Sequence, residues 1–314
     1  MISTMNHRTL HICYAVDDNF IDICCASMYS IIRRKDPETT IKFYVLGDRI
    51  TNDDKFRPFK NLDNIDVVVV SCDAKQIINP RIVVNRTGYA TYLRMIIPKI
   101  TLFQDVHRLL YIDSDIFAIR DIYNLFHYSL DGYSIGMVKD ACEVVCSAIR
   151  DYPFPEYEHH DWFCNAGLIL MDLDKLRKCN YADKWIQEAR EIQDDLHNDQ
   201  TIINKVNHYD CKLLPPTFQI PYHNFVRFPQ SLFSSIHMWN RVYGTKYSSL
   251  DELVRSCYFW HFYEDKKKLS AQFPFIKYLL NYFMEDFKEF IQTNRVKPWR
   301  QEDDESLYID FSKY

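Results

Sequence analysis

The chain has 314 residues, a net charge of −5 and 47% hydrophobic residues. This length suits one large α/β domain with a small appendage, or two modest domains, and the apolar content is enough to bury a sizeable core. The negative net charge and the lack of a run of five like charges disfavour a nucleic acid as the main partner, because such proteins usually carry a basic footprint.

The N-terminal stretch MISTMNHRTLHICYAV has no charged region followed by a long apolar run, and the longest aliphatic run is Val67–Val70. A membrane span needs about 20 apolar residues. We therefore expect a soluble, cytoplasmic protein with no transmembrane segment, whose ten cysteines are reduced structural thiols. The six glycines form neither a P-loop nor a G-x-G-x-x-G motif, so side chains or a metal would have to bind any phosphate.

Strand-like and helix-like segments alternate along most of the chain. Apolar runs predict strands at 10–16, 41–48, 65–71, 108–113, 133–140 and 165–173. Helices are expected at 20–35, at 91–100 with a stop at Pro98, and at 174–193 with Asp174 as the N-cap. This order predicts an α/β fold with a mainly parallel sheet flanked by helices. Ligands bind beyond the C-terminal strand ends of such sheets, and these ends carry Asp17, Asp113, Asp115 and Asp140.

The C-terminal part of the chain has a different pattern. The segment 273–292 places apolar residues at helical spacing and mixed charge on its other face. We expect a C-terminal helical add-on over 268–314, next to a main domain over 1–267. A helix docked on the core is the favoured interpretation. The alternative is a patch for a partner, an acceptor or a membrane surface, although mixed rather than basic charge weakens the membrane version.

Asp113 and Asp115 follow the buried run LLYI and stand two residues apart. Residues at this spacing in a strand face the same side, and two adjacent carboxylates repel each other unless a cation lies between them. Oxygen ligands suit Mg²⁺ or Mn²⁺. The alternative is a pair of turn carboxylates, one of them paired with Arg120. A second D-x-D triplet, Asp172 to Asp174, is explained by helix capping.

The surrounding sequence strongly resembles the family 8 glycosyltransferases. The segments TYLRMIIPKI and LLYIDSDIFAIRDIYNLF carry a Tyr-x-Arg helix and a strand that delivers D-x-D. Four further segments resemble motifs of that family in the family's order: YAVDDNF, FCNAGLILMDL, NDQTIIN and FWHF. The resemblance spans about residues 10 to 265. It implies a GT-A, Rossmann-like fold with a mixed, mainly parallel sheet, and a retaining enzyme with a nucleotide-sugar donor.

The resemblance also implies roles for individual residues. The donor-binding residues would be Ala15, Asp17 and Asn19 at the uracil and ribose, Arg94 at the diphosphate or sugar, and Asp113, Ser114 and Lys267. The metal, Mn²⁺ in first place and Mg²⁺ in second, would be bound by Asp113, Asp115 and His261. The catalytic residues around the transferred sugar would be Asp140, Asn165, Asp199 and Gln200.

Several of these residues have a simpler structural interpretation. Without the resemblance, Arg94 would be assigned to a surface ion pair, His261 to the edge of the core and Asp199 to a helix cap. The chain also departs from the family after His261, where HFYEDKKKL contains no Gly or Pro. Lys267 stands at the common six-residue offset from His261, with Lys266 and Lys268 as competitors.

The expected activity is transfer of a hexose, with galactose favoured over glucose, from a UDP-sugar to a glycan or glycopeptide acceptor in bacterial surface-glycan or protein O-glycan synthesis. Two rival hypotheses are a catalytically degenerate nucleotide-sugar-binding protein and a metal-dependent phosphohydrolase. A phosphohydrolase would normally bring more His and Asp ligands for a two-metal centre. The donor sugar, the acceptor, the choice between front-face attack and double displacement, and the oligomeric state stay open.

Overall fold

The computed structural model describes residues 8–81, 88–141, 162–192, 198–221, 235–262 and 274–299. The strands are β1 (Thr9–Val16), β2 (Thr40–Asp48), β3 (Ile65–Cys72), β4 (Arg108–Ile112), β5 (Ile116–Ala118), β6 (Ile135–Lys139), β7 (Cys164–Asp172), β8 (Cys211–Leu213), β9 (Ile220–Pro221) and β10 (Phe259–His261). The α-helices are α1 (Ile21–Arg34), α2 (Ala74–Ile78), α3 (Tyr123–Phe126), α5 (Leu173–Lys178), α6 (Tyr181–Glu191), α7 (Asn198–Asn207), α9 (Ile236–Tyr243), α10 (Leu250–Arg255) and α12 (Pro274–Thr293). The 3₁₀ helices are η1 (Asp18–Phe20), η2 (Asp54–Asn61), η3 (Tyr89–Lys99), η4 (Thr101–Phe103) and η6 (Pro216–Phe218).

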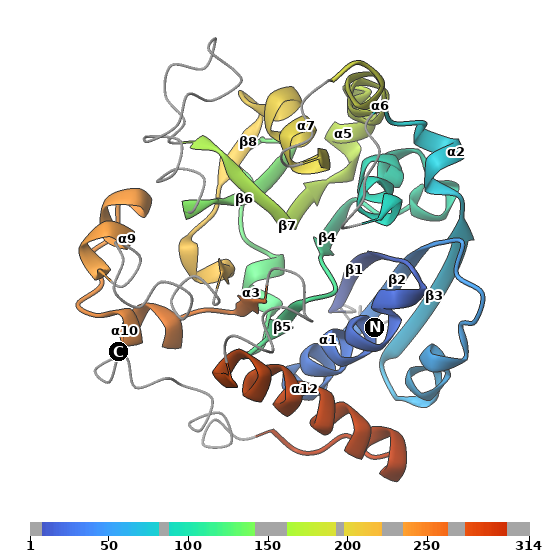
Figure 1. The fold of residues 1–314 in the computed structure, drawn as a ribbon, viewed down its shortest axis with the longest axis vertical. Helices are drawn as coiled ribbons and strands as arrows, with labels where there is room; N and C mark the ends of the chain where they lie inside the picture. The colour runs from blue at the N-terminus through green and yellow to red at the C-terminus, as the bar shows by residue number, and fades with distance from the viewer. Residues whose placement is uncertain are drawn as a thin grey trace, which may run out of the picture.

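A mixed sheet of seven strands forms the centre, in the order β3-β2-β1-β4-β7-β6-β8 (Figure 1). Strands β3, β2, β1 and β4 are parallel, β7 is antiparallel to both of its neighbours, and β8 is parallel to β6. The predicted mixed, mainly parallel sheet is therefore confirmed. A second sheet, β5-β10-β9, pairs the late strand β10 with β5, which directly follows β4.

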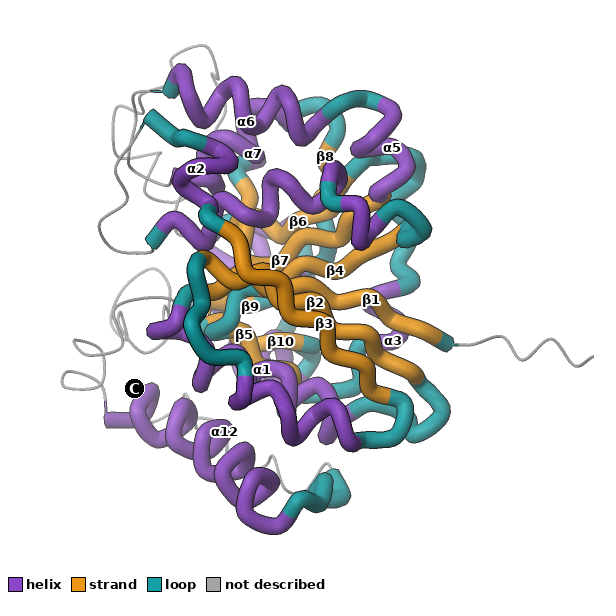
Figure 2. Tube along the Cα trace, turned by 90° about the vertical axis from the view of Figure 1, so that its right-hand side faces the viewer, coloured by secondary structure: helices purple, strands orange, loops and turns teal. Residues whose placement is uncertain are grey.

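Helices cover both faces of the large sheet. Figure 2 shows it between a layer with α2, α5, α6 and α7 and a layer with α1 and α12. The side chains of β1 explain this layering, because successive residues of a strand point to opposite faces. Leu10, Ile12 and Tyr14 belong to the hydrophobic cluster shared with α1 and α12, whereas Cys13 belongs to the cluster shared with η3 and α6.

Two predicted helices differ in detail. The expected helix at 174–193 is broken into α5 and α6 at Asn180, whose φ of 53° is left-handed and ends a helical run. The N-cap of α5 is Asp172, which accepts from the backbone N–H of Lys175, so the assignment of Asp174 as the cap was wrong. The helix expected at 91–100 is the 3₁₀ helix η3, which includes Pro98.

Helix α12 packs into the core. Its buried side chains, Phe283, Phe287 and Phe290 among them, belong to the same hydrophobic cluster as α1, and Figure 1 shows the two helices side by side. Arg33 of α1 and Asp286 of α12 form an ion pair of 2.7 Å in which both side chains are buried. These contacts fit the docked-helix interpretation. The boundary at 267/268 lies outside the described residues and stays a prediction, as does a peripheral membrane contact.

Truncation of Phe283 is expected to destabilise the whole domain. Its ring is 1% exposed and stacks on Phe117 at a centroid distance of 4.5 Å, so Phe283→Ala should cost about 3–5 kcal/mol of unfolding free energy. Ile291→Ala on the same helix is the matched control, because Ile291 is 45% exposed and should cost less than about 1 kcal/mol. Urea unfolding measures both. Equal effects of the two changes would contradict the docked arrangement.

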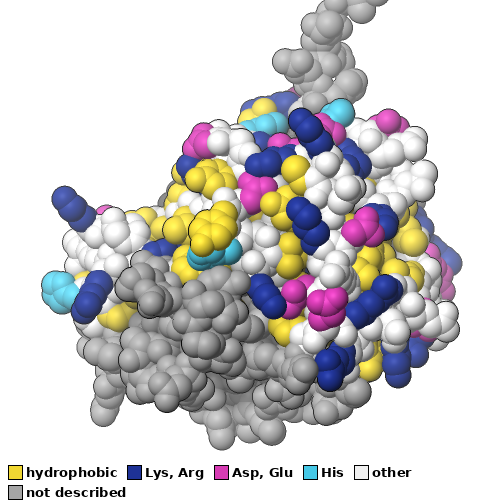
Figure 3. Space-filling view, turned by 90° about the horizontal axis from the view of Figure 1, so that it is seen from above, with side chains coloured by type: hydrophobic (Ala, Val, Ile, Leu, Met, Phe, Trp, Pro, Cys, Tyr) yellow, Lys and Arg dark blue, Asp and Glu magenta, His cyan; other side chains and the backbone are white. Residues whose placement is uncertain are grey.

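Positive and negative side chains are intermixed on the face of the molecule that lies at the top of Figure 1. Figure 3 shows Lys and Arg side chains interspersed with Asp and Glu, with hydrophobic side chains between them. No helix among the described residues has the length and hydrophobicity needed to cross a bilayer. The cysteines of the same ranges are thiols rather than disulfides.

Candidate active site

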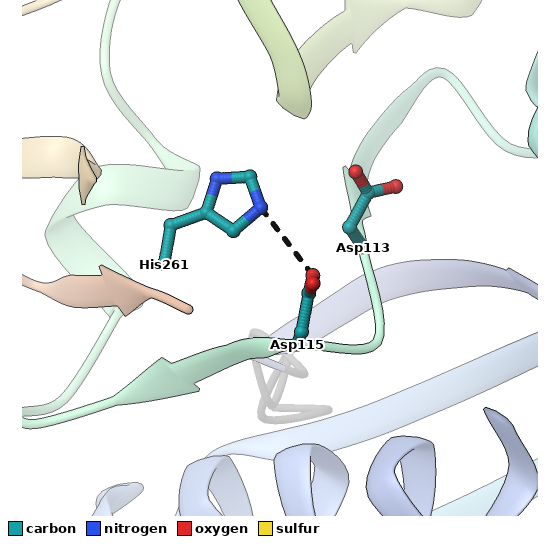
Figure 4. A group of neighbouring side chains, drawn as sticks. All are labelled: Asp113, Asp115 and His261. Atoms are coloured by element: carbon teal, nitrogen blue, oxygen red, sulfur yellow. Dashed lines mark ion pairs between the residues drawn. The ribbon is translucent and has the colours of Figure 1, made fainter. Parts of the chain in front are cut away.

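Three predicted metal ligands come together at one edge of the large sheet. Asp113, Asp115 and His261 each offer one ligand atom, and these atoms lie within 4.8 Å of one another. Figure 4 shows the two carboxylates on the turn between β4 and β5, with the imidazole facing them from β10. The Nε2 atom of His261 lies 3.3 Å from the nearer carboxylate oxygen of Asp115.

The two carboxylates converge because of a turn and not because of a strand. Strand β4 ends at Ile112 and β5 begins at Ile116, so the expectation that the pair shares one face of a strand was wrong. The backbone N–H of Asp113 donates to the carbonyl of Gly167 at 2.8 Å, and the carbonyl of Asp115 accepts from Phe262 at 2.9 Å. These bonds fix the turn to both sheets.

Arg94 forms an ion pair with the metal-ligand cluster through Asp113. Its guanidinium lies 2.8 Å from Asp113 and 3.0 Å from Asp199, and it also donates to the backbone carbonyl of Ala166. The Nε–H points at the Thr91 carbonyl at 2.9 Å, so the attraction between Arg94 and Asp199 is mainly electrostatic. Arg94 is 3% exposed, which overturns the surface-pair alternative.

The alternative partner for the D-x-D pair lies elsewhere. Arg120 donates to the backbone carbonyl of Arg255, and its guanidinium lies over the ring of Tyr258 at 5.7 Å. The cation beside Asp113 is Arg94. The carboxylate pair is thus better explained as part of a larger buried site than as an isolated turn.

A second polar group lies beside the metal ligands. Asp140, at the end of β6, accepts from the amide groups of Asn165 at 3.1 Å and of Gln200 at 3.2 Å. The carbonyl oxygen of Gln200 accepts from the Ala166 N–H at 2.9 Å. All three side chains are buried, so the structure brings together three of the four residues predicted around the transferred sugar.

Asp199, the fourth of these residues, lies in the first turn of α7, where the helix dipole favours a carboxylate. The pKa of its carboxyl is raised to about 6. Burial is the largest cause of this rise, Arg94 opposes it, and the negative charge of Asp113 adds to it. The guanidinium of Arg94 thus lies between the carboxylates of Asp199 and Asp113 and connects Asp199 to the metal-ligand cluster.

Gln219 connects the metal-ligand cluster to the Asp140–Asn165–Gln200 network. The sequence analysis did not predict a role for this residue. Its amide nitrogen lies 2.7 Å from Asn165 Oδ1 and 2.5 Å from His261 Nδ1. It directly precedes β9, which pairs with β10. No spacing rule links residue 219 to 261, since the pairing of two very short strands creates the contact.

Gly167 is a second residue whose role was missed. A Cβ at this position would lie 2.6 Å from His261 Cε1, 2.9 Å from Asn165 Oδ1 and 3.1 Å from Asp113 Oδ2. Real Cβ atoms essentially never approach other atoms to less than 3.0 Å, so an added Cβ would displace at least His261 and Asn165. The scarcity of glycine in this chain was the signal that could have drawn attention to it.

Gly167→Ala should therefore displace the metal ligands and weaken Mn²⁺ binding on the order of 10-fold or more, as for other changes that reorient ligands. Gly47→Ala is the matched control, because its Cβ would meet the side chain of Ile50, outside the site. Both changes should lower stability. Titration of free Mn²⁺ by electron paramagnetic resonance should show a loss of affinity for Gly167→Ala alone, and unchanged affinity would contradict the close approach.

The residues predicted to hold the base lie at the end of β1. Ala15 is half-buried in the strand, and Asp17 caps η1 by accepting from the backbone N–H of Asn19 at 2.9 Å. Ser114 is buried within the D-x-D turn. Lys267, with Lys266 and Lys268, lies outside the described residues. Contact of any of these residues with a nucleotide remains a prediction.

The ligand set suits a hard or borderline divalent cation. Two carboxylates and one imidazole provide the oxygen and nitrogen donors that Mn²⁺ accepts readily and Mg²⁺ accepts in part. Arg94 already balances part of the charge of Asp113, so a single cation would complete the balance at the cluster.

The strand order and the small sheet that returns to β5, with the carboxylate–imidazole cluster between the two sheets, are those of a GT-A fold. The solved galactosyltransferase LgtC, in complex with donor and acceptor sugar analogues, superposes with a TM-score of 0.63 at 17% identity, over 88% of this chain and 95% of LgtC.

The chain belongs to glycosyl transferase family 8, whose family model matches residues 11–268. Glycosyltransferase GlyB of Streptococcus pneumoniae is 24% identical over 251 residues, which is 79% of this chain and 56% of GlyB. The lipopolysaccharide 1,2-glucosyltransferase of Escherichia coli K12 is 27% identical over 180 residues, or 56% of this chain and 51% of that protein. The chain thus matches only about half the length of these two relatives.

Proposed function

We propose that this protein is a retaining glycosyltransferase that moves a hexose from a UDP-sugar to a hydroxyl of a glycan or glycopeptide. The observation that carries the proposal is the position of the Asp113–Asp115–His261 cluster beside the buried Asp140–Asn165–Gln200 network. The first group suits a cation that binds a diphosphate, and the second suits the hydroxyls of a sugar.

The cation site would be occupied by Mn²⁺, with Mg²⁺ as the second choice. Asp113, Asp115 and His261 would hold it, and when bound it would supply Lewis-acid stabilisation of the charge on departing UDP. Arg94, whose guanidinium donates to Asp113 at 2.8 Å, orients this carboxylate for the task. Lys267 would share the charge of the diphosphate, and Ala15, Asp17, Asn19 and Ser114 would hold the uridine.

The transfer itself would be a front-face attack. The acceptor oxygen bonds to the anomeric carbon on the side from which UDP leaves, the carbon–oxygen bond to UDP breaks, and the acceptor proton passes to a phosphate oxygen of UDP. Gln200 would place its carbonyl oxygen near the positive charge that develops on the sugar. That oxygen already accepts from Ala166 and keeps a second lone pair for this contact.

Galactose is the favoured donor sugar and glucose the next. The names of two similar proteins, a galactosyltransferase and a lipopolysaccharide glucosyltransferase, support this pair and a bacterial surface-glycan setting. A cytoplasmic location is proposed on the sequence alone.

Release of UDP from UDP-galactose and UDP-glucose, measured with Mn²⁺ and with EDTA, tests the proposal. We expect turnover of one donor with Mn²⁺ and none with EDTA, and the released hexose should first show the anomeric configuration of the donor by NMR. A degenerate binding protein would be stabilised by UDP and Mn²⁺ without turnover. A phosphohydrolase would release inorganic phosphate from substrates without regard to the sugar, and either result would contradict the proposal.

A further inference from the structure

Gln219 has an unsatisfied polar atom inside the site. The side chain is 1% exposed, and its Oε1 has no hydrogen-bond partner among the described residues. Buried carbonyl oxygens are nearly always partnered, because an unpartnered one loses the hydrogen bonds it would make to water. Oε1 is therefore an acceptor that can take up a further hydrogen bond, on a side chain that contacts His261.

The contact between Gln219 and His261 links the orientation of the carboxamide to the tautomer of the imidazole. A carboxamide nitrogen can only donate, so the His261 Nδ1 that lies 2.5 Å from it carries a lone pair. In a neutral ring the proton then resides on Nε2, which faces Asp115 at 3.3 Å. This tautomer cannot bind a cation through Nε2, because the proton occupies the lone pair that would coordinate it.

A cation at the cluster needs the opposite tautomer. Figure 4 shows that the ring nitrogen facing the two carboxylates is the one paired with Asp115. When Nε2 coordinates a metal, the proton moves to Nδ1 and requires an acceptor there. Gln219 can supply one by turning its carboxamide over, which exchanges the nitrogen for the unpartnered Oε1.

We propose that Gln219 is a positioning residue of the metal site, whose carboxamide reverses when a divalent cation binds. This inference rests on the proposed function and deepens it. After reversal, Oε1 accepts the Nδ1–H of His261 and holds the imidazole with Nε2 toward the cation. The same movement withdraws the amide N–H from Asn165 Oδ1, at present 2.7 Å away.

The reversal connects the cation site to the Asp140–Asn165–Gln200 network, which would bind the sugar. With the carboxamide turned, two oxygens face each other between Gln219 and Asn165. A sugar hydroxyl that donates to Asn165 relieves this repulsion. Cation binding and sugar binding are therefore cooperative through one side chain, which differs from a purely structural role for Gln219.

Two substitutions in the full chain distinguish a positioning role of Gln219 toward His261 from a purely structural role. Gln219→Leu removes both polar groups and should weaken Mn²⁺ binding on the order of 10–100-fold, the usual cost of losing a partner of a ligating histidine. Gln219→Glu presents only acceptors to Nδ1 and should bind Mn²⁺ at least as tightly as the wild type. Asn207→Leu is the control, because this buried amide bonds to Trp185 and Ser134 and should change stability but not affinity for Mn²⁺.

The tautomer supplies an independent measurement. In protein labelled with ¹⁵N-histidine, the ring nitrogens of His261, assigned by comparison with His261→Asn, should change from the Nε2–H to the Nδ1–H form when diamagnetic Mg²⁺ saturates the site. An unchanged tautomer in the saturated protein, or wild-type Mn²⁺ affinity in Gln219→Leu, overturns the inference and leaves the proposed function intact. A wild-type chain that binds neither cation overturns the cation site and the inference together.

Discussion

Asp115→Asn is expected to abolish cation-dependent release of UDP, with a fall in rate on the order of 10³-fold. The amide keeps the size of the side chain but removes its charge, so the ligand set would hold a divalent cation weakly. The carboxylate of Asp115 already lies 3.3 Å from His261 Nε2, and its side chain is 16% exposed, which leaves little room for water to replace it.

Asp174→Asn is the matched control for this change. Asp174 belongs to the second D-x-D triplet, yet it is exposed and pairs with Arg177 and His107 outside the site. The rate of UDP release should be unchanged in this variant. Circular dichroism establishes that both proteins are folded, and an active Asp115→Asn enzyme would contradict the metal assignment.

Arg94→Met should cost about 3–5 kcal/mol of unfolding free energy, because it leaves the buried Asp199 and the half-buried Asp113 without their cation. Arg94 contacts both Asp113 and Asp199, so the variant loses two attractions and retains two charges. Arg94→Lys keeps the positive charge but lacks the planar guanidinium. Its unfolding free energy should therefore lie between those of Arg94→Met and the wild type. Arg57→Met is the control, since its pair with Asp54 is exposed and should contribute less than about 1 kcal/mol.

The loss in Arg94→Met should depend on pH in a defined direction. The folded-state pKa of Asp199 is raised to about 6 from an ordinary value of 3.8. The folded protein therefore binds more protons than the unfolded chain between these values, and this carboxyl lowers stability as pH rises through that window. Removal of Arg94 strengthens the effect, so urea unfolding should show a smaller loss near about pH 5 than near about pH 8. An equal loss at both pH values would contradict the buried pair.

The strands of the large sheet were largely predictable because most of them are apolar on both faces and therefore appear as apolar runs in the sequence. Strands β1 to β4 lie within one or two residues of the segments expected from their apolar runs. The position of β10 was not predictable, because three residues pair with β5 through contacts far apart in the sequence. The break at Asn180 was missed for a local reason, since a left-handed residue interrupts a helical pattern that continues on both sides.

The metal ligands were predicted correctly as neighbours, although the physical reason differed. Strand alternation suggested that Asp113 and Asp115 point the same way, whereas the structure uses a turn fixed by Gly167 and Phe262. Gln219 was missed because a single glutamine in the connection LLPPTFQIP belongs to no recognisable motif. Its importance comes from burial and from contacts with His261 and Asn165, and only the fold supplies these.

The central claim is that Asp113, Asp115 and His261 hold a cation that binds the diphosphate of a nucleotide sugar. Titration of Mn²⁺ by electron paramagnetic resonance, with and without UDP, tests it most directly. We predict one bound ion per chain, with an affinity that increases when UDP is present, and loss of both effects in Asp115→Asn. Mn²⁺ affinity that is absent in the wild type, or that is the same with and without UDP, would contradict the claim.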